Sequence, residues 1–470
     1  MSLSKRESAS VSRAASAHVE DRIWSVVKYA VLSRVISLAL GAASNAFVED
    51  YDSSLSVFLP PVDEAKASVA FWSLESLARA LAQIVVRWDA FYFVHIADAG
   101  YIYEQEHAFF PLLPLLMRAL TSTVLSPLAS AIGRQLALVV AGVLVSNTAF
   151  VLAAVTLYRL GCRSLSNEKL AYVSALMFVV APSNMFMSAV YTESLFAWLA
   201  FSALLLVSYE QYLLAALCLG ASTLCRSNGI TYAGFFVWNL LVRQEAWAEF
   251  AGDRGMRRWR AKIGTLLSRV FYSLILVALS SLGFVAFEIF GRRKLCKIPA
   301  GASEPERRLY CSDSLSTVYG FVQSKYWDVG FLRYYTLQQA PNFLLAAPMI
   351  VLSVAGLWAY AAHDPTRFVS LGWVQRTPAA AASTGYFNRR LLPHMYLWAV
   401  LLFVATTSMH VQVITRFFSG LPVVFWFAGH AVAAASLGPN RRWVQWAVVG
   451  YFVGYGLVGA VLFSNFFPPA

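Results

Sequence analysis

The chain has 470 residues, of which 59% are hydrophobic and only 13% are charged, and its formal net charge is +12. A soluble globular protein carries about 25% charged residues, so this composition excludes that class and indicates a protein surrounded by lipid. The basic residues lie between hydrophobic runs and form no stripe with interleaved aromatic residues, which argues against nucleic acid as a partner. Five cysteines are too few for a disulfide scaffold.

The hydrophobic runs predict an all-α polytopic membrane protein. A transmembrane helix needs about 20 apolar residues, whereas a strand of a membrane β-barrel alternates apolar and polar residues. The run from Leu136 to Leu157 is continuously apolar and therefore predicts a helix. In chain order, the runs cover residues 23–47, 108–126, 134–158, 170–190, 194–210, 212–225, 229–242, 268–290, 341–361, 393–409, 416–435 and 443–465.

The distribution of Lys and Arg predicts the orientation, because positively charged loops tend to stay in the cytosol. All the basic segments can be cytosolic together only if the run 108–126 does not cross the membrane. Pro111, Pro114 and Arg118 in this run favour a re-entrant or interface helix. We therefore expect about eleven transmembrane helices. The basic segments are 1–22, 159–169, 243–269, 362–392 and 436–442.

This topology divides the chain into a tail and one domain. Residues 1–22 are expected to be a disordered cytosolic tail, and residues 23–470 a single integral membrane domain. Residues 48–133 and 291–340 are then lumenal loops, the second in spite of its own basic residues. Cys296 and Cys311 in that second loop form a disulfide if the lumen is oxidising, or else stay as two unpaired thiols.

Four polar clusters fall on the lumenal side in this topology. Charged residues beside a bilayer are costly, so clusters that are distant in sequence and meet at one membrane face predict an active site. The clusters span residues 88–107, 191–194, 226–229 and 409–416.

Two carboxylates are the candidates for the catalytic base. Asp89 lies between Trp88 and a run of aromatic residues, at the level where aromatic belts meet lipid headgroups. It could accept the proton of an attacking sugar hydroxyl, or instead cap the helix that follows, with Trp88 as an interface anchor or a substrate contact. Asp50, just beyond the first span, is the second candidate.

Further acids lie where a helix begins. Glu104, Glu106 and His107 precede the helix that starts near Ala108, where they could hydrogen-bond to sugar hydroxyls or simply complement the helix dipole. Glu193, between two spans, is either a sugar contact or an ordinary loop acid.

Two arginines are candidates for binding a lipid phosphate. Arg226 and Arg416 present planar guanidinium groups that match phosphate oxygens, although arginines at such positions can also snorkel to headgroups. Asn228 and Gln412 are also candidate substrate-binding residues, because they lie in the polar clusters 226–229 and 409–416. His410 is a further candidate, as a hydrogen-bonded interface histidine rather than a metal ligand, because no second ligand lies at a suitable spacing.

No glycine-rich nucleotide-binding loop is present in the sequence, so a sugar donor carried on a lipid fits better than a soluble sugar nucleotide.

These clusters resemble the signature of the GPI mannosyltransferase 2 family, also called the PIG-V family, of the GT-C glycosyltransferase superfamily. The likeness runs from about residue 22 to the C-terminus, in family order. Asp98 stands where the family pattern has Glu, which keeps the charge. The matching blocks are Trp88-Asp89, Ile96-Ala97, Gly100-Tyr101, Ala108-Phe109-Phe110-Pro111, Tyr191 to Phe196, Cys225 to Gly229, Pro341 to Ala346, Met409 to Gln412 and Thr415 to Phe417.

The resemblance implies a GT-C-type fold and an enzyme of the endoplasmic reticulum membrane. It implies transfer of the second, α-1,6-linked mannose from dolichyl-phosphate-mannose to the GPI glycolipid intermediate, with inversion at the sugar carbon. The N-terminus is then cytosolic and the active site lumenal. We expect no cofactor and no metal, because arginine already neutralises the donor phosphate.

Three other functions stay open from the sequence. One is another GT-C transferase that uses a dolichyl-phosphate-linked sugar and a different acceptor. The second is a lipid flippase or transporter, which would need charges at mid-membrane depth and internal repeats. The third is a non-catalytic subunit of a lipid-processing complex, which would tolerate loss of Asp89. A small membrane partner subunit is a further expectation, and the sequence does not decide whether the activity requires one.

Overall fold

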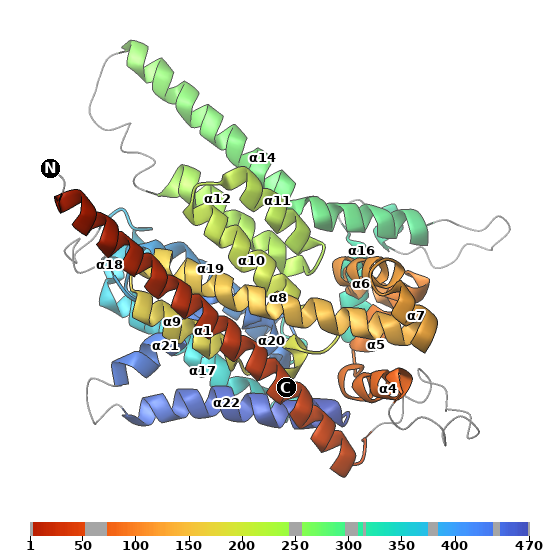
Figure 1. Ribbon diagram of the computed structural model, residues 1–470. Helices are drawn as coiled ribbons and strands as arrows, with labels where there is room; N and C mark the ends of the chain where they lie inside the picture. The colour runs from red at the N-terminus through yellow and green to blue at the C-terminus, as the bar shows by residue number, and fades with distance from the viewer. Residues whose placement is uncertain are drawn as a thin grey trace, which may run out of the picture.

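The computed structural model describes residues 3–51, 73–243, 256–296, 309–313, 316–374, 384–435 and 442–468. Within these ranges the chain forms helices and connecting turns and no β-strand, as predicted for an all-α membrane protein. Figure 1 shows long helices stacked across one another, with α5, α6, α7 and α16 gathered at one end and α18 at the other.

Six helices among the described residues are long and apolar enough to cross a membrane, or up to eight spans if two bent helix pairs each count as one. The predicted number of eleven crossings is therefore not confirmed. The six are α1 (Leu3–Phe47), α8 (Arg134–Leu165), α14 (Met256–Leu295), α17 (Ala340–His363), α19 (Leu392–Thr407) and α22 (Arg442–Ser464).

Three predicted spans are short helices: α9 (Glu168–Val179), α10 (Glu193–Ser208) and α11 (Tyr212–Thr223). At a rise of about 1.5 Å per residue they extend roughly 18–24 Å, which is less than the hydrocarbon thickness of about 30 Å. Polar turns interrupt the apolar runs and place the helix ends inside the protein, where they form the site described below.

The region between α1 and α8 consists of short helices: α4 (Leu74–Val85), α5 (Ala90–Ala99), α6 (Leu112–Ser122) and α7 (Ser126–Ile132). An 84° bend separates α6 from α7. Arg118 of α6 donates hydrogen bonds to the carbonyl oxygens of Ala97 and Asp98, and so ties α6 to the C-terminal end of α5. Helix α6 has only 11 residues, and together with α7 it forms either a broken span or a re-entrant loop, so the prediction that residues 108–126 do not cross the membrane stays a prediction.

Helix α1 begins at Leu3, so most of the predicted tail continues the helix of the first span. Adding a residue to an existing helix costs far less than starting a new one, which explains the continuation. Deeper in the membrane, Arg34 is buried and donates hydrogen bonds to the backbone and side chain of Asn184 and to Ser188. A buried arginine of a span needs such partners, and these bonds hold α1 against the turn before α10.

The centre of the bundle is α8, which packs against α9 and α10, while α11 packs against α14. The α11–α14 contact depends on glycine, because a Cβ atom at Gly283 would lie 2.3 Å from the carbonyl oxygen of Gly220. Small residues let two membrane helices approach this closely. The segment 411–420 is made of η8 (Val411–Val413), α20 (Ile414–Phe417) and η9 (Phe418–Gly420), and a 92° bend separates it from α21 (Pro422–Ala435).

The second predicted loop contains α15 (Leu309–Ser312) and α16 (Val318–Trp327). Cys296 and Cys311 form a disulfide that joins the end of α14 to α15. Glu288 of α14 accepts the backbone N–H groups of Val318 and Tyr319 at 2.7 and 2.9 Å, which satisfies the N-terminus of α16. These two links hold α16 against the end of α14. The remaining described elements are η1 (Glu104–Ala108), η2 (Met185–Met187), η3 (Ser227–Ala233), α12 (Gly234–Val237), η4 (Trp238–Val242), η6 (Leu337–Gln339), α18 (Pro365–Val369) and η7 (Arg389–Leu391).

Candidate active site

A left-handed turn between α4 and α5 positions Asp89. Trp88 has φ +54°, a conformation that costs a non-glycine residue roughly 1–2 kcal/mol. The hydroxyl of Tyr191 bridges the turn, since it donates to the carbonyl oxygen of Arg87 and accepts the N–H of Asp89, both at 3.0 Å. Burial first, and then the charge of Asp89, hold the pKa of Tyr191 well above its usual range, so this hydroxyl stays protonated.

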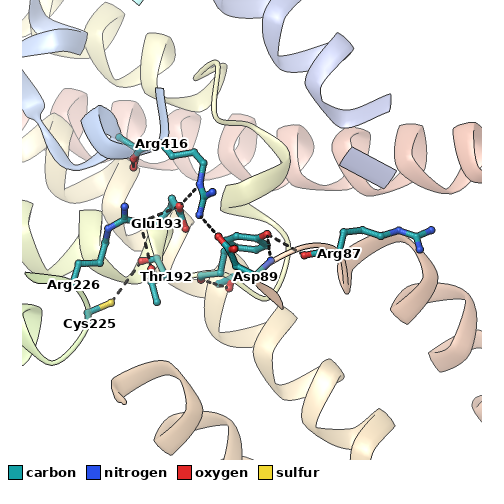
Figure 2. A network of polar contacts seen from close by, with 10 residues as sticks. Arg87, Asp89, Thr192, Glu193, Cys225, Arg226 and Arg416 are labelled. Atoms are coloured by element: carbon teal, nitrogen blue, oxygen red, sulfur yellow. Dashed lines mark hydrogen bonds and ion pairs between the residues drawn. The ribbon is translucent and has the colours of Figure 1, made fainter. Parts of the chain in front are cut away.

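Asp89 belongs to a chain of alternating acids and arginines. Its Oδ2 accepts a hydrogen bond from Nη2 of Arg416 at 3.1 Å, and Nε of the same arginine donates to Oε1 of Glu193 at 2.8 Å. Arg226 completes the chain with Nη1 at 2.9 Å from Oε1 of Glu193. Figure 2 shows the guanidinium group of Arg416 between Glu193 and Asp89, while the side chain of Arg87 extends away from them. We call Asp89, Glu193, Arg226 and Arg416 the charged quartet.

The quartet joins four parts of the chain that are distant in sequence. Asp89 directly precedes α5, Glu193 is the first residue of α10, Arg226 directly precedes η3, and Arg416 lies in α20. Glu193 is fully buried, and its Oε2 has no hydrogen-bond partner among the described residues. Asp89 keeps 31% of its side chain exposed. The chain of ion pairs is therefore buried at Glu193, between the two arginines, and accessible at Asp89.

A cavity of about 600 Å³ opens beside the quartet. Asp89, Arg226 and Arg416 form part of its wall, whereas Glu193 lies behind it. The wall combines hydroxyl, amide and imidazole groups with aromatic rings, a mixture that suits a sugar and an attached lipid. The polar lining residues include Thr192, Ser227, Asn228, Thr231, Gln323, Ser408 and His410, and the aromatic ones Phe93, Phe109, Phe110, Tyr319, Trp327 and Phe417.

Asp89 does not act as a helix cap through its side chain. It stands at the N-cap position of α5, but its carboxylate makes no capping hydrogen bond and instead pairs with Arg416. This removes the structural alternative that the sequence left open.

Asp50 and Trp88 lie outside the cavity lining. Asp50 forms an ion pair with the buried Arg87 at 3.0 Å and accepts a hydrogen bond from Asn45. Trp88 is 40% exposed, and its ring lies 6.0 Å from that of Phe466. Asp50 therefore supports the turn before Asp89, through Arg87, and does not face the same space.

The predicted cluster at Glu104, Glu106 and His107 also lies outside the cavity lining. Glu104 accepts hydrogen bonds from Tyr310 and Tyr326 of the second loop region. Glu106 accepts backbone N–H groups of Ile102 and Tyr103 and contacts His95 at 2.5 Å. His107 is buried between the rings of Tyr101, Phe287 and Phe290. These side chains hold α16 and the turn before α6 in place.

The other predicted residues lie at or beside the cavity. Asn228 and His410 line it, and the ring of His410 contacts the carbonyl oxygen of Trp327 at 2.6 Å. Gln412 is not among the lining residues and lies next to Tyr334. In the described part of the chain, no three His, Cys, Asp or Glu side chains converge as a metal-binding group.

The sequence did not single out several residues of the site. Tyr191 and Thr192 directly precede Glu193 in the polar cluster 191–194. Their position next to a candidate residue could have identified them as part of the site. Nothing in the sequence could have identified Tyr319, Gln323 and Trp327 of α16, because the composition of their segment is that of an ordinary loop. Only the packing of α16 against η1 brings them to the cavity.

The fold and the site together define a multi-pass membrane protein with a charged quartet beside a cavity of mixed polar and aromatic lining. Residues 23–470 match the family described as mannosyltransferase (PIG-V). The chain belongs to this family, as its sequence motifs predict.

The curated relatives match over nearly their whole length. A GPI alpha-1,6-mannosyltransferase 2 from Cricetulus griseus is 31% identical, covering 94% of this chain and 98% of the relative. A GPI mannosyltransferase 2 from Gibberella zeae is 32% identical, covering 93% of this chain and 95% of the relative.

Among solved structures, an archaeal oligosaccharyltransferase from Archaeoglobus fulgidus, in complex with an inhibitory peptide and a dolichol-phosphate, has a TM-score of 0.46 and 12% identity. The match covers 94% of this chain and 56% of that one. A likeness this weak carries no argument about the site.

Proposed function

We propose that this protein transfers mannose from dolichyl-phosphate-mannose to the 6-hydroxyl of the first mannose of the GPI precursor. Family membership and the names of the relatives support the reaction. The observation that supports the site is the Asp89–Arg416 ion pair at the wall of the cavity. It sets a proton acceptor and an anion-binding group side by side.

In the proposed reaction, Asp89 takes the proton of the acceptor 6-hydroxyl as that oxygen attacks C1 of the donor mannose. The bond between C1 and the phosphate oxygen breaks, and the electron pair leaves with dolichyl phosphate. Attack from the face opposite the leaving group inverts the configuration at C1. Arg416 and Arg226 stabilise the negative charge that develops on the departing phosphate.

The remaining lining residues have supporting roles in this proposal. Asn228 and His410 hydrogen-bond to sugar hydroxyls, and the aromatic wall packs against the sugar ring and the first units of the lipid. Glu193 keeps the two arginines in place from behind the wall. Its free Oε2 can accept a hydrogen bond from a substrate hydroxyl or a water molecule.

We also propose that no metal takes part, because two guanidinium groups already face the space where the donor phosphate would lie. Activity in excess chelator should equal activity in added Mg²⁺ or Mn²⁺. A loss in chelator that one of these ions restores would contradict this part of the proposal.

The proposed setting is the endoplasmic reticulum membrane, with the N-terminus cytosolic and the cavity facing the lumen. Glycosylation acceptor sites inserted before residue 22 and after Thr336 test the orientation, since only the lumenal one should be glycosylated. Pull-down from detergent extract tests for a small membrane partner subunit.

Complementation tests the reaction and the base together. Asp89→Asn and Asp89→Ala are expressed in cells that lack the second GPI mannosyltransferase, and surface GPI-anchored protein is measured by flow cytometry. Wild type should restore the surface signal, and both variants should abolish it at equal protein level. Asp98→Asn is the matched control, because Asp98 lies at the other end of α5 and pairs with Arg134 outside the cavity.

Each outcome has a separate meaning. Full rescue by both Asp89 variants would refute Asp89 as the base. Failure of the wild type itself, at normal expression, would refute the proposed reaction.

A further inference from the structure

A second cavity of about 340 Å³ lies at the other end of the bundle. Helices α10 and α19 connect the two cavities, since Glu193 and Ser208 are the first and last residues of α10, and α19 runs from Leu392 at one cavity to the turn before His410 at the other. The length of α10 puts about 24 Å between them. In Figure 1, α18 and the start of α1 lie at this end, away from α5, α6 and α16. The candidate active site does not extend into this second cavity.

The second cavity is strongly basic. Among the described residues that line it, the carboxylate is Glu210, which lies 3.7 Å from Arg243. Charges of one sign in a cleft with apolar walls focus a positive potential, which attracts anions. The charged lining residues are Arg163, Glu210, Arg243, Arg367, Arg389 and Arg390.

Arg367 is the strongest single indication of a ligand. It is fully buried, and Nη1 donates to the carbonyl oxygen of Phe387 at 3.1 Å, while the guanidinium carbon lies 4.8 Å from the ring centre of Tyr360. Within the described part of the chain, its Nε and Nη2 have no hydrogen-bond partner. A snorkelling arginine would reach water, whereas this one holds two donors inside the protein beside a cavity. Buried donors are almost always satisfied, so a bound acceptor accounts for them.

The other lining groups complete an anion site. Arg163 is fixed by hydrogen bonds to the side chain and backbone oxygens of Ser208 at 3.0 and 2.7 Å. The first turn of α19, at Leu392 to His394, also lines the cavity. The N-terminus of this 16-residue helix adds a partial positive charge. Arg390 is exposed and marks the way in.

The position of the cavity indicates a ligand that lies in the membrane surface. Trp238 and Leu371 line it, and Leu371 is 45% exposed. Aromatic and apolar residues beside a basic opening are typical of protein surfaces at headgroup level. The volume falls at the lower end of the roughly 300–1,000 Å³ at which small ligands bind.

We propose that this cavity binds the phosphate group of an anionic lipid headgroup, with Arg367 as the innermost contact and Arg390 at the entrance. The site is separate from the proposed transfer of mannose and does not depend on it. A free phosphate compound offers the same chemistry, so the test includes both sources.

The test uses the purified full-length protein in a neutral detergent. Its midpoint of thermal unfolding, Tm, is followed with added dioleoyl phosphatidic acid, dioleoyl phosphatidylcholine or sodium pyrophosphate. A ligand that binds only the folded protein stabilises it by RT ln(1 + L/Kd), where L is the ligand concentration, so Tm rises with ligand concentration. We expect a rise with phosphatidic acid, none with phosphatidylcholine, and a fall in the effect as salt is added.

Three variants locate the effect. Arg367→Gln and Arg390→Gln should each weaken the apparent affinity for phosphatidic acid roughly tenfold or more, because each loses a charge-assisted contact to phosphate. Arg159→Gln is the matched control, since Arg159 is exposed on the same helix as Arg163, one turn away, and does not line the cavity. If Arg367→Gln does not fold, the Tm shift of Arg390→Gln, at the exposed entrance, tests the proposal by itself.

A rise with phosphatidic acid alone, lost in the cavity variants, supports a lipid headgroup. An equal rise with pyrophosphate, lost in the same variants, supports the phosphate site with a soluble source. No rise with either, or the same rise in Arg390→Gln and wild type, would overturn the proposal.

Discussion

Replacing Arg416 by lysine tests the geometry of the charged quartet while keeping its charge. Arg416 contacts two carboxylates with two different nitrogen atoms, Nε to Glu193 and Nη2 to Asp89. Its guanidinium plane also lies over the rings of Phe186 and Tyr191, at 4.3 and 4.9 Å from their centres. A lysine has one nitrogen on a flexible stem and no planar fork, so it cannot reproduce these contacts together.

The expected magnitude follows from the loss of one charge-assisted hydrogen bond. Such a bond contributes about 1.5–3 kcal/mol, which corresponds to roughly a 10- to 150-fold lower rate if the contact is needed in the transition state. Arg416→Gln should be worse than Arg416→Lys. It removes the charge and leaves the buried Glu193 with one arginine, and breaking a buried ion pair costs about 3–5 kcal/mol.

The assay measures transfer of labelled mannose from dolichyl-phosphate-mannose to the GPI intermediate in microsomes, per unit of the protein. Arg333→Lys is the control, because Arg333 is half-exposed and pairs with Asp328 on the surface, where an ion pair contributes about 0–1 kcal/mol. The control should change the rate by less than about fivefold. Arg416→Lys at the wild-type rate would refute the argument that the fork geometry matters.

The remaining predictions concern how the structure holds the site. Tyr191→Phe leaves two bridged backbone groups without their partner, so it should lower stability by about 1–3 kcal/mol and reduce transfer; an unchanged Tm would contradict the bridge. Cys296→Ser with Cys311→Ser should cost about 3 kcal/mol for a loop of this length, and alkylation of either thiol in unreduced protein would contradict the disulfide. Gly283→Ala should reduce the yield of monodisperse protein through a clash of about 1–3 kcal/mol or more between α11 and α14, whereas Gly454→Ala, with open space around it, should not. Equal yields for the two glycine variants would refute the close contact.

The candidate residues divide according to the partners they find in space. Asp89, Glu193, Arg226 and Arg416 come from clusters that the sequence singled out, and the structure brings them into one chain of ion pairs. Glu104 and Glu106 carry the same chemistry in the same segment, yet they bond to tyrosines and backbone groups away from the cavity, and His107 packs between aromatic rings. Residue type therefore identified the candidates. Only the packing of the helix ends shows which of them face the cavity and which support the fold.

The amino-acid sequence by itself determined the all-helical membrane class and the family. Apolar runs require helices in lipid whatever their neighbours are, and the motifs are read directly from the order of residues. The tertiary structure decided which apolar runs form short helices, the burial of Glu193 behind the wall, and the contribution of α16 to the cavity. It also gathered five arginines around a second cavity, although in the sequence they are ordinary basic residues of separate loops. These features depend on where short helices end against one another, and packing between distant segments sets those positions.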